Sequence, residues 1–235
     1  TDIRSDEELE AAFHRAKESS TQVIIEKYLT GNDYRMLVID GKFIAAARRV
    51  PASVTGDGTH TIAELIEIEN KNPRRGYGHE NVMTRLQISS VTTHLLNLKG
   101  YTLESVLPDG EQFFLELTAN LSTGGSAVDV TNRVHTSNKF MAERIAKIIG
   151  LDIAGIDVIS PTLRQPIGKI GGGVIEVNAA PGLRIHLSPA EGTPRNVAKP
   201  IVDMLFPKGS QSDILIIAVT GTNGKTTTVR LISHI

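Results

Sequence analysis

The stretch that decides the fold is GVIEVNAAPG at residues 173–182. It is an apolar run of the β type that carries Glu176 and Asn178. Because alternate residues of a strand point to one side, these two side chains share a face. A carboxylate is costly to bury without a partner, which favours a functional role for Glu176 over a chance polar residue at a strand end.

A second apolar run, AGIDVIS at residues 154–160, carries Asp157. Two neighbouring strands would then each present oxygen ligands, from Asp157 on one and from Glu176 with Asn178 on the other. Three hard oxygen donors suit Mg²⁺ bridged by ATP phosphates, and they suit neither zinc nor iron. We therefore expect these three residues to form a magnesium site.

The composition is that of an ordinary soluble globular protein of one large domain or two small ones. The net charge of −1 and the 4% aromatic content argue against general nucleic-acid binding. No run approaches the roughly 18 to 20 apolar residues of a membrane helix. The absence of cysteine excludes disulfides and a thiol nucleophile. We expect a cytoplasmic protein and, since the sequence opens without Met, an internal piece of a longer one.

Periodicity and capping signals predict alternating helices and strands. Capping-box spacings open two of the helices, and Gly150 closes another. The helices are expected at residues 5–18, 61–69, 79–98, 137–149, 193–205 and 228–235. The strands are expected at residues 23–29, 34–40, 42–50, 112–118, 154–160, 173–178 and 214–220. Asp40-Gly41 is the favoured pair for a two-residue hairpin turn between two of these strands.

The loop at residues 70–78, NKNPRRGYG, contains a short basic cluster of Lys71, Arg74 and Arg75. Short charge runs are usually solvated, so we expect an exposed loop, with a substrate-guiding role as the alternative.

A phosphate-binding loop is predicted near the end of the sequence, where a strand at 214–220 enters GTNGKTT. Glycine N–H groups can wrap phosphate oxygens, Lys225 supplies charge, and a threonine hydroxyl can hold Mg²⁺. The full motif would need glycine at Val219, so this loop is shorter, and an incidental strand-to-helix turn is the alternative. The expected nucleotide-binding residues are Gly221, Thr222, Asn223, Gly224, Lys225, Thr226 and Thr227.

Two segments resemble families of ATP-dependent enzymes. The loop within residues 214–235 resembles that of the Mur ligases, which join an amine to a carboxylate. VIIEKYLTGNDYR at residues 23–35, together with IEVNAAPG, resembles the ATP-grasp fold, whose members activate a carboxylate as an acyl phosphate. The latter resemblance implies an α/β (α+β) fold in which Asp33 lies near the ribose. It further implies two Mg²⁺ ions on Asp157, Glu176 and Asn178, and adenine contacts from Glu26, Lys27, Tyr28 and Leu29.

The order of these segments resembles the cyanophycin synthetase family, in which an ATP-grasp domain is followed by a Mur-ligase-like domain. RRVPASVTGDGTHTIAELI, TANLSTGGSAVDVT and GLDIAGIDVI are also similar to that family. The resemblance implies a partial ATP-grasp domain at 1–206, a linker at 207–213 and the start of a Mur-ligase-like domain at 214–235.

The same resemblance implies the cofactors ATP and Mg²⁺. Its partners would be aspartate, arginine and an aspartate-arginine polymer primer, without nucleic acid or membrane, and with homo-oligomers a possibility. Aspartate would be added at the ATP-grasp site and arginine at the Mur-like site. ATP-grasp enzymes also use a lysine and a glycine-rich flap that precede the first helix and are absent from this sequence, so we expect the chain alone to be inactive.

Four further residues are candidates for catalytic contacts: Arg49, Asn120, Ser122 and Arg184. Arg49 could meet phosphate or the growing carboxylate, and Arg184 could fork onto a substrate carboxylate, although surface cations explain both about as well. The loop at 120–126 offers side-chain donors and two glycines whose N–H groups could approach an oxyanion, but an ordinary turn also explains them. The seven histidines show no pair at metal-ligand spacing.

Two other interpretations stay open. One is a different ATP-grasp ligase that acts on amino acids or peptides, although most such enzymes lack a second phosphate loop. The other is a non-catalytic nucleotide-binding module.

Overall fold

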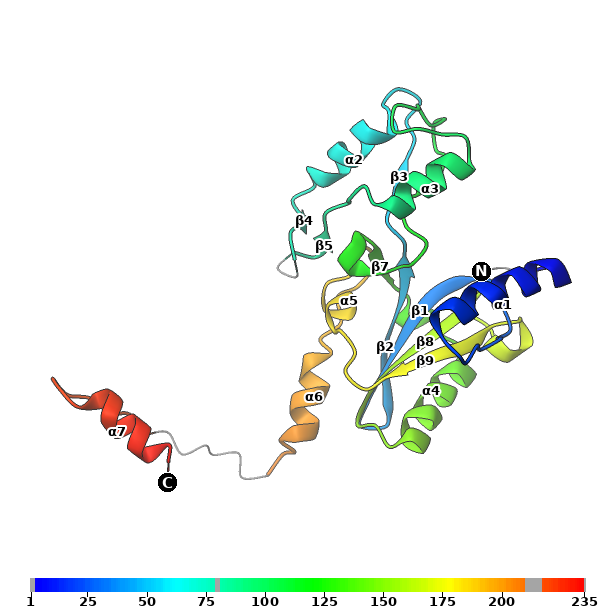
Figure 1. Ribbon diagram of the computed structural model, residues 1–235. Helices are drawn as coiled ribbons and strands as arrows, with labels where there is room; N and C mark the ends of the chain where they lie inside the picture. The colour runs from blue at the N-terminus through cyan, green and yellow to red at the C-terminus, as the bar shows by residue number, and fades with distance from the viewer. Residues whose placement is uncertain (1–2, 79–80, 210–216, 235) are drawn as a thin grey trace.

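The computed structural model describes residues 3–78, 81–209 and 217–234, and its centre is a five-stranded sheet (Figure 1). The strands follow the order β7-β2-β1-β8-β9, and each neighbouring pair is antiparallel. The fold is therefore of the α+β kind. Its strands are β1 (Asn32–Ile39), β2 (Lys42–Val50), β7 (Ser126–Asp129), β8 (Ile153–Ser160) and β9 (Gly173–Asn178).

The β1–β2 hairpin turns at the predicted pair. Asp40 has a φ of 52° and Gly41 a φ of 67°, the left-handed conformations that a type I′ turn requires. Asparagine, aspartate and glycine tolerate this region best, so the local sequence determines where the chain reverses.

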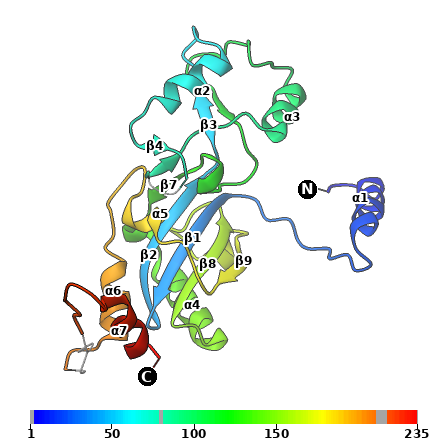
Figure 2. The ribbon, with the colours of Figure 1, turned by 60° about the vertical axis from the view of Figure 1, so that its left-hand side comes forward.

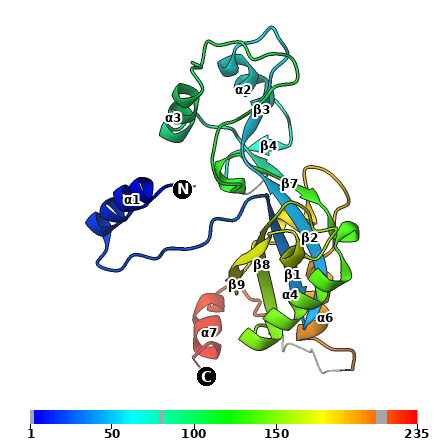
Figure 3. The same ribbon diagram turned by 90° about the vertical axis from the view of Figure 1, so that its right-hand side faces the viewer.

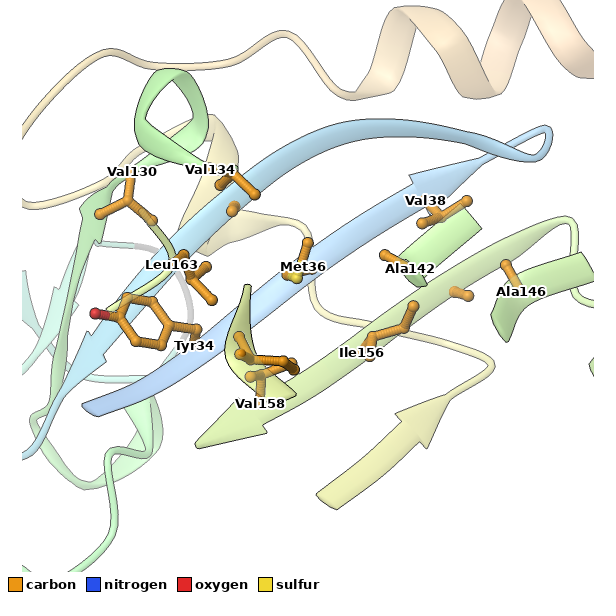
Figure 4. Close-up of a cluster of buried hydrophobic side chains, with 13 residues drawn as sticks. Tyr34, Met36, Val38, Val130, Val134, Ala142, Ala146, Ile156, Val158 and Leu163 are labelled. Carbon is orange, nitrogen blue, oxygen red and sulfur yellow. The ribbon is translucent and has the colours of Figure 1, made fainter. Parts of the chain in front are cut away.

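Helix α4 (Thr136–Ile149) packs on one face of the sheet. It begins after His135, whose Nδ1 accepts from the Ser137 N–H, and it ends at Gly150 with a φ of 79°. Figure 4 shows side chains of β1 and β8 pointing toward this helix. The buried cluster includes Tyr34, Met36, Val38, Ala142, Ala146, Ile156 and Val158.

The opposite face of the sheet is apolar at one end and charged at the other. Its apolar end, formed by Leu37, Ile39 and Ala45, packs against Val197 and residues of α6 (Ala198–Leu205). The short helix α5 (Arg184–Leu187) contacts β2 and β7. The charged end is left for the site described below.

A smaller unit with its own core lies beside the sheet, at the top of Figure 1. It contains α2 (Ile62–Asn70), α3 (Ser90–Leu98), the pair β3 (Ser53–Thr55) and β6 (Gln112–Phe114), and the pair β4 (Arg75–Gly76) and β5 (Met83–Thr84). Phe113 and Leu107 are fully buried in it. The predicted capping box of Thr61 and Glu64 is confirmed.

The helices at the two ends, α1 (Asp6–Ser19) and α7 (Lys225–Ile232), bury none of their residues. Figures 2 and 3 show α1 joined to β1 by a long extended segment. Three short 3₁₀ helices complete the described elements: η1 (Leu121–Thr123), η2 (Thr131–Arg133) and η3 (Ile167–Lys169). None of the helices in the described ranges has the length and apolar character needed to cross a membrane.

Several predicted elements differ from the structure. The strand expected at 23–29 is extended but unpaired, and only 90–98 of the helix expected at 79–98 is helical, with 79–80 outside the described residues. The strand expected at 112–118 ends at Phe114, and the helix expected at 193–205 starts at Ala198. Of the strand expected at 214–220, residues 214–216 lie outside the described residues and 217–220 form no strand. Most of the linker predicted at 207–213 also lies outside the described residues.

Candidate functional site

Charged side chains from four adjacent strands meet at the polar end of the sheet, on the face away from α4. In the strand register, Asp33 is opposite Arg49, Arg35 is opposite Asp157, and Asp157 is opposite Glu176. Residues directly opposite in antiparallel strands have Cβ atoms about 4.5 to 5.5 Å apart. The backbone register therefore places all five side chains in one cluster.

Asp157 lies between two arginines. Arg35 donates from Nε to Oδ1 and from Nη2 to Oδ2, the latter at 2.8 Å. Arg49 donates from Nη2 to Oδ2 at 3.0 Å. The Asp157 side chain is only 3% exposed, so both guanidinium charges act on it with little solvent screening.

Arg49 also holds Asp33, with its Nε at 2.8 Å and its Nη2 at 2.7 Å from Oδ1. Burial raises the pKa of the Asp33 carboxyl above its ordinary value, although the Arg49 charge opposes this shift. The cluster thus balances two carboxylates against two guanidiniums before Glu176 is counted.

Two cavities adjoin this cluster. The larger, of about 940 Å³, is lined by Asp33, Asp157 and Glu176 and by the apolar side chains of Phe114 and Ile175. The smaller, of about 580 Å³, is lined by Asn120, Leu121, Ser122, Leu183 and Arg184. Both cavities share a wall formed by Arg35, Arg49, Ala119 and Asn120. The two arginines therefore face both spaces.

The segment predicted to bind adenine borders the larger cavity in part. Tyr28 and Leu29 line it, and the Tyr28 residue is 54% exposed. Glu26 and Lys27 line a different cavity, of about 470 Å³, between this segment and α1. An aromatic ring with apolar neighbours suits a flat heterocycle, so the geometry favours Tyr28 and Leu29 over the two charged residues.

The predicted magnesium ligands share one sheet face, but they differ in environment. Glu176 is exposed rather than buried, so the argument from a buried unpaired carboxylate was wrong for it. Asn178, opposite Gly155, has its amide nitrogen buried without a hydrogen-bond partner among the described residues. A rotated amide would present its oxygen there instead.

This donor set fits a hard divalent cation, with one condition. Asp157 and Glu176 are adjacent in the same cavity wall, and carboxylate oxygens suit Mg²⁺. Both oxygens of Asp157 are held by arginines, so a cation there must displace them. No group of three or more His, Cys, Asp or Glu side chains within the described residues could hold a metal, so waters and phosphate oxygens would complete the shell around these carboxylates.

The loop predicted to hold an oxyanion uses its backbone donors internally. The N–H groups of Gly124 and Gly125 donate to the carbonyls of Leu121 and Asn120. A Cβ at Gly125 would lie 2.6 Å from the Asn120 carbonyl oxygen, so close backbone packing explains this glycine. Asn120 and Ser122 nevertheless line the smaller cavity.

Arg184 lines the smaller cavity while its Nη1 donates to the Asn81 carbonyl at 2.9 Å. The basic loop has a structural role that the sequence did not indicate. Arg74 donates to the carbonyls of Pro189 and Ala190, and Arg75 donates to those of Thr84 and Gly124. The expectation of a solvated cluster was wrong for Arg75, whose side chain is 7% exposed.

The predicted phosphate-loop residues lie apart from this cluster in Figure 1 and are exposed. Gly224, with a φ of 81°, directly precedes α7. The Lys225 ammonium donates to the carbonyl of Gly221 at 2.7 Å. Thr222, Asn223, Thr226 and Thr227 belong to the same loop and first helical turn.

Arg35 is the site residue that the sequence analysis missed. The signal was present, since Arg35 is two residues from Asp33 on one strand and therefore shares its face. Its partner on β8 could not be identified without the strand register.

Comparison with known proteins shows relatives along the whole chain, although no family model matches it. Cyanophycin synthetases of Crocosphaera subtropica and Geminocystis herdmanii are 53% and 52% identical over 236 residues, covering all of this chain and 27% of each relative. The chain thus spans about a quarter of the length of these curated relatives.

A glutathione biosynthesis bifunctional protein of Streptococcus agalactiae serotype V is 34% identical over 201 residues, or 85% of this chain and 27% of that protein. The crystal structure of a bifunctional glutathione synthetase from Pasteurella multocida matches with a TM-score of 0.70 at 33% identity, covering 87% of this chain and 28% of that one. The chain is thus a relative of the cyanophycin synthetases over its whole length, and its fold matches that of the bifunctional glutathione synthetase.

Proposed function

We propose that this chain forms part of an ATP-dependent ligase that joins a carboxylate to an amine. The observation that carries the proposal is the shared wall of two cavities, where Arg35 and Arg49 separate a space lined by Asp157 and Glu176 from one lined by Asn120 and Arg184. Such a wall can hold a nucleotide phosphate on one side and an acceptor carboxylate on the other.

The chemistry follows from this placement. An oxygen of the acceptor carboxylate attacks the γ-phosphorus of ATP, the bond to the β–γ bridging oxygen breaks, and ADP leaves. The amine then attacks the acyl carbon, phosphate departs, and the nitrogen loses a proton. Guanidinium groups at the wall would stabilise the negative charge on the transferred phosphoryl group and the tetrahedral oxygen.

Magnesium would be held by Asp157 and Glu176, with Asn178 beside them, once Asp157 is released from its arginines. When bound there it would supply positive charge to the phosphate oxygens. Tyr28 and Leu29 would contact the base, and Asp33 would lie near the sugar.

The finer assignment follows the relatives. Cyanophycin synthetases match the entire chain at 52–53% identity, whereas the glutathione protein matches 85% of it at 34%. This supports aspartate and arginine as amines, with aspartate added at the sheet site to an aspartate-arginine polymer. The GTNGKTT loop would belong to a second, Mur-like site for arginine.

The test is phosphate release by the full-length protein with ATP, Mg²⁺ and an aspartate-arginine polymer primer, adding aspartate or arginine singly. We expect wild type to respond to both amino acids. Glu176→Ala should abolish only the aspartate response, and Lys225→Ala only the arginine response.

Two control variants each remove one charge, as the test variants do, but at positions outside the proposed sites. Glu104→Ala and Lys169→Ala remove exposed charges outside both cavities and should retain both responses. If neither amino acid stimulates phosphate release in wild type, the polymer assignment is refuted. If Glu176→Ala leaves the aspartate response intact, the sheet site is wrongly placed.

A further inference from the structure

The arginines of the shared wall are occupied in this structure by the carboxylate that a metal would need. Arg35 uses its Nε and Nη2 edge on Asp157, and Arg49 uses its Nε and Nη2 on Asp33 and Asp157. This edge of a guanidinium is the one that forks onto a planar carboxylate. An acceptor carboxylate in the smaller cavity therefore competes with Asp157 for the same donors.

We propose that Asp157 acts as an internal competitor that couples the two cavities, so that a magnesium nucleotide must bind before the acceptor carboxylate binds tightly. The inference rests on the proposed function and concerns the order of binding at that same site. A divalent cation on Asp157 repels the guanidiniums of Arg35 and Arg49 and takes over its oxygens. The freed arginines then face the smaller cavity, which they already line.

Because the arginines are buried, each state of the site must provide them with a carboxylate partner. The Arg35 side chain is 11% exposed, that of Arg49 13% and that of Asp157 3%, so an unpaired guanidinium has little access to water. Buried charges are retained when they are paired. Arg35, which has no other carboxylate partner among the described residues, therefore requires one that is supplied by Asp157 without the metal and by the acceptor with it.

The charged residues around Arg35, Arg49 and Asp157 are consistent with this change of partner. Asp33 stays on Arg49 in both states and keeps it at the wall. Arg184 lines the smaller cavity with one nitrogen on the Asn81 carbonyl, which leaves it as a third cation for the acceptor. Glu176 has no hydrogen-bond or ion-pair partner within the described residues, so removing it frees no arginine.

The energetic consequence is reciprocal. If the magnesium nucleotide raises the affinity for the acceptor by some factor, the acceptor raises the affinity for the magnesium nucleotide by the same factor. We expect a factor of at least about five, the lower end of the range for coupled sites.

The experiment is calorimetric titration of the full-length protein with β-aspartyl-arginine dipeptide, first without metal or nucleotide and then with Mg²⁺ and a non-hydrolysable ATP analogue. Wild type should bind the dipeptide at least about fivefold more tightly in the second condition. Asp157→Asn should bind it about fivefold more tightly than wild type in the first condition, because its neutral amide holds the arginines weakly.

Glu176→Gln is the matched control, since it removes an equal charge from the opposite residue of the neighbouring strand. Its affinity for the dipeptide without metal should equal that of wild type within error. If Asp157→Asn binds the dipeptide no better than wild type, or if Glu176→Gln gains as much, the competition is refuted.

The proposed function and this inference fail separately. If aspartate does not stimulate phosphate release in wild type, the ligase assignment is refuted, but Asp157→Asn can still bind the dipeptide more tightly. An unchanged Asp157→Asn affinity in a protein that still ligates would refute only the coupling.

Discussion

Replacing Arg35 with methionine should destabilise the protein by about 3 kcal/mol, because it leaves Asp157 short of a partner in the interior. Breaking a buried ion pair from one side generally costs 3 to 5 kcal/mol, on the order of what an uncompensated charge requires. The lower end applies here because Arg49 keeps its 3.0 Å bond to the same carboxylate. Methionine retains much of the apolar stem of Arg35, so lost packing adds little.

The double variant Arg35→Met/Asp157→Leu separates charge from packing. With both partners apolar, no buried charge is stranded, and Arg49 keeps Asp33, so the loss should fall to about 1 kcal/mol or less. The double variant should therefore be about 2 kcal/mol more stable than Arg35→Met alone, whereas independent sites would make it less stable.

The assay is urea unfolding at pH 7 followed by far-UV circular dichroism, since the sequence contains no tryptophan. Arg144→Met on the exposed side of α4 is the matched control and should change the free energy of unfolding by less than about 0.5 kcal/mol. A loss of under about 1 kcal/mol for Arg35→Met, the value typical of surface ion pairs, would refute the buried cluster. A double variant that is no more stable than Arg35→Met would refute it equally.

Two further predictions concern stability. Gly31→Ala should lower the free energy of unfolding by about 2 kcal/mol or more, because a Cβ there would lie 2.3 Å from the Ser160 carbonyl carbon. Gly41→Ala, with open space around it, should lower it by about 1 kcal/mol. Equal losses in urea unfolding would contradict the close approach at Gly31. Burial lowers the pKa of His186 to about 4, aided by the charge of Arg35. The unfolded chain takes up this proton below about pH 6.5 and the folded protein only near pH 4, so up to about 3 kcal/mol of stability should be lost across this interval as the pH falls. His186→Gln should flatten the pH dependence of the unfolding free energy in this interval, and an unchanged slope would mean that His186 is not buried and neutral.

Local sequence signals predicted the elements whose ends depend on their own residues. The hairpin at Asp40-Gly41, the capping box at Thr61 and the helix closed by Gly150 all formed as expected. These features depend on φ preferences and on side-chain bonds to nearby N–H groups, which act over a few residues.

Elements that depend on a distant partner were predicted less well. The apolar run at 23–29 has strand composition but finds no neighbouring strand in the described residues. Residues 79–98 carry helical periodicity, yet Met83 and Thr84 pair with Arg75 and Gly76 instead. β-propensity describes a fit to a pleated, half-buried surface, and only the tertiary structure supplies that surface.

The sequence by itself determined that Asp157, Glu176 and Asn178 would lie on strands of alternating face, because the two-residue period of a strand is a property of the backbone. Only the tertiary structure decided that Arg35 is opposite Asp157, that Arg49 bridges it to Asp33, and that Arg75 ties the smaller unit to the η1 loop. Buried charges must find opposite charges or carbonyl oxygens, and residues 108 to 122 positions away supply them here. The site therefore depends on strand register, which is set by the pairing of strands and cannot be derived from the sequence of one strand.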